Sequence, residues 1–178
     1  MHIPPVGIDE LFSSLDLDIL LNAVMTLHRE HTGKINSGGV LAMARIDMQD
    51  DVGTDYMSRC IGILTSTQLV RYSYNANEKW QRLLKRRKDG ASTEFLSRAS
   101  ADPDNADETK RTYPGCVLFL YETSPGLQLY ISFSGAHGDV DEAICLILGN
   151  KLGFNCPASL NPLIPRAAEL LEHVRRMC

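Results

Sequence analysis

The residues best suited to binding or catalysis lie in one short loop, Ser134-Gly-Ala-His-Gly-Asp139. Its glycines let the backbone come close to a ligand, and free N–H groups are expected where the loop opens a helix. A hydroxyl and an imidazole add polar groups beside them. The candidate ligand-binding residues are therefore Ser134, Gly135, His137, Asp139 and Asp141.

The same loop has a structural interpretation, which we favour: a strand-to-helix connection in which Asp139 caps the helix. Asp139, Asp141 and Glu142 already place negative charge there, which disfavours an anionic ligand. In a catalytic interpretation, His137 is a general acid or base that Asp139 or Asp141 orients. A serine nucleophile is not predicted, because Phe133 directly precedes Ser134 and the G-x-S-x-G pattern is missing.

A pair of histidines, His28 and His31, forms H-x-x-H near the end of an expected helix. Residues three apart share a helix face, so a shared metal is geometrically possible. Two ligands alone do not make a zinc site, and the negative end of a helix attracts histidine in any case. We therefore predict no metal site, with His28 and His31 as weak candidates.

A basic run, Lys79 to Lys88, carries six basic residues in ten. On a helix, Arg82, Lys85 and Arg86 form a positive strip that can meet phosphate, nucleic acid or an acidic partner. The solvated face of an amphipathic helix has the same pattern, and acidic residues 102–108 can neutralise the strip. A net charge of −4 and a pI near 5.7 also argue against nucleic acid and membrane surfaces as partners.

The composition is that of one globular domain spanning residues 1–178, with 44% hydrophobic and 22% charged residues. Five cysteines without a C-x-x-C pair indicate reduced, mostly buried thiols and a cytoplasmic location. No signal peptide is recognisable, and no apolar run reaches the roughly 20 residues of a membrane span. No cofactor is identified by the residues themselves.

The first half of the chain predicts a helix, strands and a second helix. Ser14 or Asp16 is expected to cap a helix that runs to about His31 and ends at Gly33. The expected strands are Val40–Ile46 and Cys60–Leu64, with an acidic loop at 47–55 between them, and Leu69–Tyr74 continues the second strand or forms a third. Asn75 or Asn77 is expected to cap a helix over Glu78–Lys88 that stops at Asp89-Gly90.

The second half predicts two strands, Gly115–Tyr121 and Leu127–Phe133, a helix that begins at Asp139, and a last helix over Arg166–Arg176. Polar residues 92–112 are expected to form an exposed loop. Strands joined by short turns pair antiparallel. The fold class is therefore α/β of the α+β kind, a mainly antiparallel sheet of four to five strands packed with helices in the order helix, strands, helix, strands, helix, helix.

Residues 113–152 resemble a known family. Tyr113-Pro-Gly-Cys-Val, followed by Leu129-Tyr-Ile-Ser-Phe-Ser-Gly-Ala-His-Gly-Asp-Val-Asp-Glu-Ala, is similar to the end of the GlcG/HbpS-like haem-binding family, where a glycine-led strand, a hairpin and an acidic helix start follow one another. The resemblance implies haem as a small ligand. It assigns no axial ligand to any residue of this chain.

Two functions follow from these patterns. The first is a non-enzymatic binding or interaction module, which acts by self-association, through a partner protein or on a small ligand such as haem. The element order also looks like that of profilin-like and roadblock-type modules, which commonly dimerise, so we expect a homo-oligomer or a partner protein. The alternative is a small-molecule enzyme that uses the 134–139 loop, with His137 as general acid or base.

Overall fold

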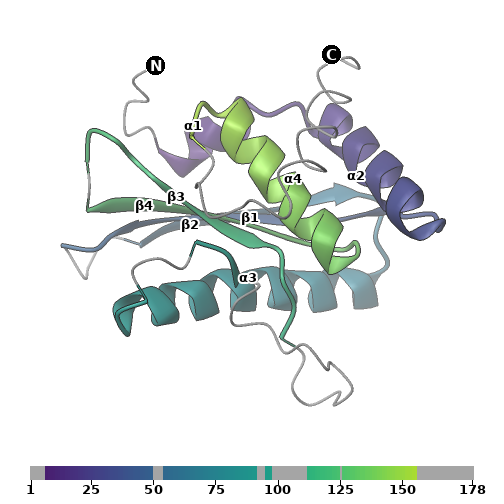
Figure 1. Ribbon diagram of the computed structural model, residues 1–178. Helices are drawn as coiled ribbons and strands as arrows, with labels where there is room; N and C mark the ends of the chain where they lie inside the picture. Colours follow the sequence, from purple (N-terminus) through teal and green to yellow (C-terminus); the bar gives the residue numbers. More distant parts are fainter. Residues whose placement is uncertain (1–6, 50–53, 92–94, 98–111, 125, 156–178) are drawn as a thin grey trace.

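The computed structural model describes residues 7–49, 54–91, 95–97, 112–124 and 126–155. Its elements are α1 (Ile8–Ser13), α2 (Leu17–Thr32), β1 (Gly38–Asp47), β2 (Thr54–Gly62), α3 (Ser66–Lys88), β3 (Cys116–Leu120), β4 (Leu127–Ser134) and α4 (Gly138–Lys151) (Figure 1). This is the predicted α+β fold with an antiparallel sheet. The helix expected at 166–176 and nearly all of the loop expected at 92–112 lie outside the described residues.

The sheet has the order β2-β1-β4-β3, and every neighbouring pair runs antiparallel. In this register Ala44 of β1 lies between Tyr56 of β2 and Tyr130 of β4. Helices α1, α2 and α4 cover one face of the sheet, and α3 covers the other (Figure 1). The fold is therefore a three-layer arrangement with a hydrophobic core on each side of the sheet.

Side chains of a strand alternate between its two faces, so β1 supplies both cores. Leu41 and Met43 pack in the larger core, together with α1, α2 and α4. Ala42 and Ala44 face α3, where Trp80 is buried. Within the larger core Gly149 of α4 is essential to close packing, because a Cβ added there would lie only 2.0 Å from Cζ of Phe119.

Helix α2 begins and ends where the sequence predicts. The Asp16 side chain accepts hydrogen bonds from the backbone N–H groups of Asp18 and Ile19, and Gly33 ends the helix with φ of 70°. Aspartate is a common N-cap residue, and a glycine in the left-handed conformation commonly ends a helix. None of the helices in the described part of the chain combines the length and the apolar composition needed to cross a membrane.

The prediction for residues 69–88 is wrong, because one helix of 23 residues, α3, replaces the expected strand and shorter helix. Its N-cap is Thr65, which forms a capping box with Gln68, so neither Asn75 nor Asn77 caps a helix. Val70, Tyr72 and Tyr74 favour a strand by intrinsic propensity. The capping box and packing against the sheet override that local preference.

The edge strand β2 also differs from the prediction. It begins at Thr54 and ends at Gly62, so Asp55, expected in a loop, belongs to the strand and pairs with Arg45 at 3.3 Å. Cys60 is exposed, although it sits in an apolar run, because α3 does not cover this edge; Cys116 and Cys145 are buried as expected. The short helix α1, which buries Ile8, Leu11 and Phe12, was not predicted.

Candidate functional site

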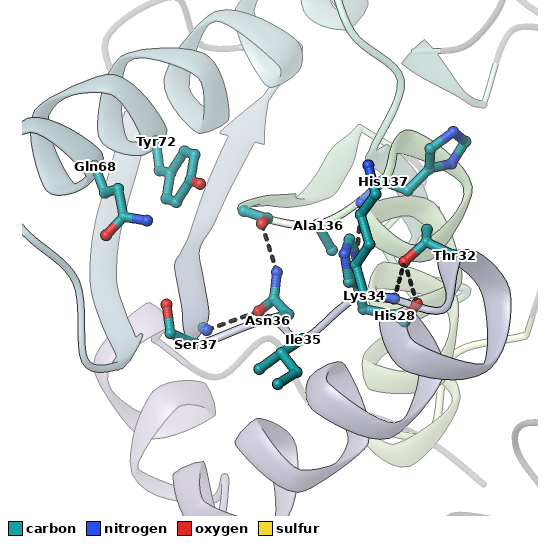
Figure 2. Close-up of a pocket in the computed structure, with 12 residues that line it drawn as sticks. His28, Thr32, Lys34, Ile35, Asn36, Ser37, Gln68, Tyr72, Ala136 and His137 are labelled. Carbon is teal, nitrogen blue, oxygen red and sulfur yellow. Dashed lines mark hydrogen bonds between the residues drawn. The ribbon is translucent and has the colours of Figure 1, made fainter.

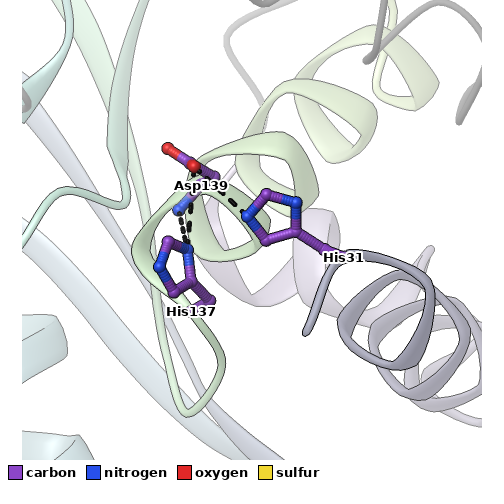
Figure 3. A group of neighbouring side chains, drawn as sticks. All are labelled: His31, His137 and Asp139. Carbon is purple, nitrogen blue, oxygen red and sulfur yellow. Dashed lines mark hydrogen bonds and ion pairs between the residues drawn. The ribbon is translucent and has the colours of Figure 1, made fainter. Parts of the chain in front are cut away.

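Two motifs that lie more than 100 residues apart in sequence meet in the structure. The last turn of α2 carries His31, and the start of α4 carries His137 and Asp139 (Figure 3). His31 Nε2 lies 3.3 Å from Asp139 Oδ2, and the centroids of the His31 and His137 rings are 4.8 Å apart. The H-x-x-H pair and the 134–139 loop are therefore parts of one group of side chains.

His28 joins this group through the backbone. Its Nδ1 accepts a hydrogen bond of 3.2 Å from the N–H of His137. Burial, followed by the positive charges of His137, His31 and Lys34, lowers the pKa of His28. A neutral imidazole is therefore favoured, as an accepting Nδ1 requires.

His137, and not Asp139, is the N-cap of α4, so that prediction is wrong. The backbone of His137 is extended, with φ of −64° and ψ of 145°, and its Nδ1 accepts a 3.3 Å hydrogen bond from the N–H of Asp139. Asp139 lies in the first turn of the helix. Its carboxylate therefore reaches His31, and its Oδ2 lies 3.7 Å from Nδ1 of His137.

A cavity of about 370 Å³ opens beside this group, between the end of α2, the start of β1, the first turns of α3 and the 134–139 loop (Figure 2). Its lining includes His28, Asn36, Gln68, Tyr72 and His137. These side chains offer imidazole, amide and phenol groups. The cavity is thus suited to a polar small molecule more than to an apolar one.

Asn36, which the sequence analysis did not single out, fixes the wall of the cavity. Its Nδ2 donates to the Gly135 carbonyl at 2.7 Å, and its Oδ1 accepts from the Gly38 N–H at 2.7 Å. Gly135 has φ of 151°, and a Cβ there would lie 2.5 Å from the Gly38 carbonyl oxygen. The glycine thus permits the close approach of two backbones. An asparagine between a helix and a strand gives no signal of this role in the sequence.

Asp141 supports the loop from inside the protein. Its Oδ1 accepts from the Ala136 N–H at 2.9 Å, and its Oδ2 pairs with Lys79 Nζ at 2.7 Å. Burial raises the pKa of Asp141 to about 6, although the charge of Lys79 acts in the opposite direction. Ser134 is buried next to this pair, and both it and Asp141 line a smaller cavity of about 150 Å³. Of the two aspartates proposed to orient His137, Asp139 is the one that lies beside its ring.

The predicted basic strip is divided by the fold. Arg82 is half-buried, pairs with Glu78 and donates to the Tyr113 carbonyl at 2.6 Å. Lys85 and Arg86 are exposed, whereas Lys79 of the same run is buried. The acidic residues 102–108 lie outside the described residues. The strip is therefore smaller than the sequence indicates.

Neither buried cysteine resembles a reactive thiol. Burial is the main cause that raises the pKa of both Cys116 and Cys145. A thiol must ionise to act as a nucleophile, so these two are suited to packing.

Comparison with protein-family models, with curated proteins and with solved structures gave no match to this chain. The resemblance of residues 113–152 to the GlcG/HbpS-like haem-binding family therefore stays a prediction. What the protein does is inferred from its own residues.

Proposed function

We propose that this protein is a non-enzymatic interaction module that self-associates by pairing β2 with the β2 of a second copy. The observation that carries the proposal is an open sheet edge flanked by exposed apolar side chains. We call this region the β2–α3 surface, and its residues are Tyr56, Cys60, Ile63, Leu69, Val70 and Tyr74.

The two edges of the sheet differ. Along β3, residues 95–97 run beside the strand: Leu96 bridges to Val117, and the Leu118 N–H donates to the Phe95 carbonyl at 2.8 Å. On the outer side of β2, no strand pairs within the described ranges. An open edge presents unpaired N–H and C=O groups, which is a template for another strand. The edge at β2 is thus the better place for a partner.

Apolar side chains lie on the same side of the molecule. Tyr56 of β2 stacks near Trp80 of α3, with ring centroids 5.7 Å apart. Leu69 lies eleven residues, or three helical turns, before Trp80 and so shares its side of the helix. Val70 lies next to it and is 72% exposed, while Ile63 in the connection from β2 is 87% exposed. Tyr56, Ile63 and Leu69 thus border the open strand, and Val70 extends the exposed apolar surface around α3.

Charge is sparse on the half of α3 that borders this surface. Residues 66–77 contain a single charged residue, Arg71, whereas residues 78–88 contain seven. Depletion of charged residues distinguishes the core of a protein interface from ordinary surface. The first half of α3 therefore has an interface composition, and the second half has a solvated one.

The sequence of β2 is complementary to itself. In an antiparallel pair centred on Met57, Asp55 of one copy lies opposite Arg59 of the other, and the twofold axis repeats this pair. Opposite charges in cross-strand positions stabilise the pairing of strands. A second copy of the chain is therefore the partner we infer.

Charge reversal tests this register. Arg59→Asp or Asp55→Arg alone places like charges opposite each other at two symmetric positions, at a cost of about 1 kcal/mol each. Asp55→Arg also removes the 3.3 Å ion pair with Arg45 of the same chain, so circular dichroism verifies that this variant is folded. We expect each single variant to weaken self-association about tenfold or more, and the double variant to recover it. Sedimentation velocity over a range of protein concentrations measures the effect.

Lys85→Asp is the control, because Lys85 is an exposed residue on the charged half of α3. It should leave self-association unchanged, whereas Val70→Arg should abolish it. A chain that stays monomeric up to millimolar concentration rejects the proposal. So does a dimer that tolerates Val70→Arg and both single reversals.

Small-ligand binding, with haem as the ligand implied by the family resemblance, is a second candidate function. Two imidazoles in the lining of the cavity, those of His28 and His137, support it, because imidazole can ligate haem iron, whereas the other polar groups of the lining suit a polar ligand. A haemin titration followed by absorbance should then give a saturable spectral change that His28→Ala reduces. An unchanged spectrum would leave self-association as the function.

A further inference from the structure

We propose that His31, His137 and Asp139 form a binding site for a divalent transition metal, with Zn²⁺ as the fitting ion. One ligand comes from the end of α2 and two come from the start of α4 (Figure 3). The site does not depend on pairing through β2, because none of its residues lies on the β2–α3 surface. It therefore goes beyond the proposed function.

The distances between ligand atoms fit a zinc shell. Zinc binds histidine nitrogen and carboxylate oxygen at about 2.0–2.2 Å in tetrahedral geometry, so that two ligand atoms lie about 3.3 Å apart. Asp139 Oδ2 lies 3.3 Å from His31 Nε2 and 3.7 Å from His137 Nδ1. Two of the three edges of the site are thus already close to the required length.

The third edge closes by a side-chain movement. All three ligand atoms lie within 4.8 Å of one another, so the two imidazoles need to approach by at most about 1.5 Å to reach tetrahedral spacing. His137 is about half exposed, at 53%, and its ring can rotate. The hydrogen bond that Nδ1 would give up is 3.3 Å long, beyond the usual range. Metal binding therefore breaks only one long hydrogen bond, the one between Asp139 N–H and His137 Nδ1.

The ligand types select the ion. Two imidazoles and one carboxylate, without a thiolate, suit Zn²⁺ and neighbouring transition metals and do not suit Ca²⁺ or Mg²⁺, which take oxygen ligands. Asp139 and His31 are partly exposed, at 32% and 21%, so solvent can complete the fourth position. The result is a three-ligand open site of the kind that also admits an external ligand.

His28 positions the site without belonging to it. Its Nδ1 holds the main chain of His137 at 3.2 Å and so fixes the loop that carries two of the ligands. Groups that orient a ligand typically change metal affinity by about 10- to 100-fold when removed. His28→Ala should therefore weaken zinc binding while the stoichiometry stays at one ion per chain.

Calorimetric titration of the full chain with ZnCl₂ tests the proposal, in a Cys60→Ser background that also carries Cys156→Ser and Cys178→Ser. These changes remove the exposed thiol of Cys60 and the two cysteines outside the described residues, since thiolates also bind zinc. We expect one Zn²⁺ per chain. His31→Ala, Asp139→Asn and His137→Asn should each weaken binding at least tenfold. Asparagine is chosen for residue 137 because it keeps an N-cap acceptor for α4 and removes only the imidazole.

Three control variants distinguish this site from non-specific zinc binding. Asp18→Asn makes the same change at an exposed carboxylate at the start of α2, and His2→Ala and His173→Ala remove histidines outside the described residues. All three should leave the affinity unchanged. Zinc should also raise the unfolding midpoint of the background protein and not that of the three ligand variants.

Two results overturn the metal site. One is a titration without saturable binding. The other is an affinity that the three ligand variants leave unchanged, or that falls as much in the controls. Circular dichroism without zinc verifies that each variant is folded. Sedimentation with and without Zn²⁺ measures the association state independently of zinc binding. The metal site and self-association through β2 can therefore each be rejected without the other.

Discussion

Lys79 Nζ lies 2.7 Å from Asp141 Oδ2, in an ion pair that joins α3 to α4 across 62 residues of sequence. The side chains are only 1% and 4% exposed. Lys79 also donates to the Phe133 carbonyl at 2.6 Å, and Asp141 accepts from Ala136. The pair thus holds both ends of the loop that presents His137 to the cavity.

Breaking this pair on one side should be costly. Lys79→Met leaves the buried carboxylate of Asp141 without its counter-charge, and such changes lower the free energy of unfolding by about 3–5 kcal/mol. The double variant Lys79→Met with Asp141→Leu removes both charges, and its free energy of unfolding should fall by less than that of the single variant. Urea unfolding measures both. A double variant less stable than Lys79→Met would show that the pair is worth more than apolar packing.

The stability of the protein should depend on pH through Asp141. Its pKa is raised from 3.8 to about 6 by burial, so between pH 4 and pH 6 the folded protein holds a proton that the unfolded chain releases. The free energy of unfolding therefore falls as pH rises across that window, by up to about 1.4 kcal/mol per pH unit.

Asp141→Asn is the reference for this prediction, because asparagine does not titrate. The wild type should gain stability relative to Asp141→Asn on going from pH 7 to pH 4, in denaturant unfolding at matched ionic strength. The opposite trend would mean that the charge of Lys79 outweighs burial and holds the pKa below its ordinary value.

Much of the fold could be predicted from local sequence patterns, because helix caps and apolar stripes depend on residues close together in the sequence. Asp16 and Gly33 bound α2 as expected, because a cap and a left-handed glycine act within a few residues. The helix expected to begin at Asp139 is present as α4, and its apolar residues, such as Val140 and Ile144, are buried. Over Leu69–Tyr74 local propensity favoured a strand, and the prediction was wrong because the capping box at Thr65 and the packing of Ala76 and Trp80 on the sheet fix one long helix.

The candidate site was predictable only in pieces. The spacing of His28 and His31 and the composition of the 134–139 loop each drew attention, but nothing local indicates that the end of α2 lies against the start of α4. That contact depends on the order β2-β1-β4-β3, which places β4 beside β1. Lys79 shows the same limit, because a lysine in a basic run is expected at the surface.

Asn36 should matter to both the cavity and stability. Asn36→Ala removes two hydrogen bonds of 2.7 Å and leaves the Gly135 carbonyl and the Gly38 N–H without them. Unsatisfied buried groups cost about 1–3 kcal/mol. Asn155→Ala is the matched control, since it removes one exposed 2.7 Å bond to Glu122 and should cost under about 0.5 kcal/mol. Equal losses in thermal unfolding would contradict the role given to Asn36.

Two opposing effects act on the stability of Gly149→Ala, and the sign of the measured change shows which one is larger. Alanine in place of glycine normally stabilises a helix interior by about 1 kcal/mol. In α4 the new Cβ would lie 2.0 Å from Cζ and 2.3 Å from Cε1 of Phe119, so the ring or the helix must move. Overpacking of this kind costs about 1–3 kcal/mol. Gly149→Ala should therefore lower the unfolding midpoint, and it should lower it less in a Phe119→Leu background, where the ring is gone. A gain in stability from Gly149→Ala in the wild type would show that α4 does not pack on the sheet as closely as described.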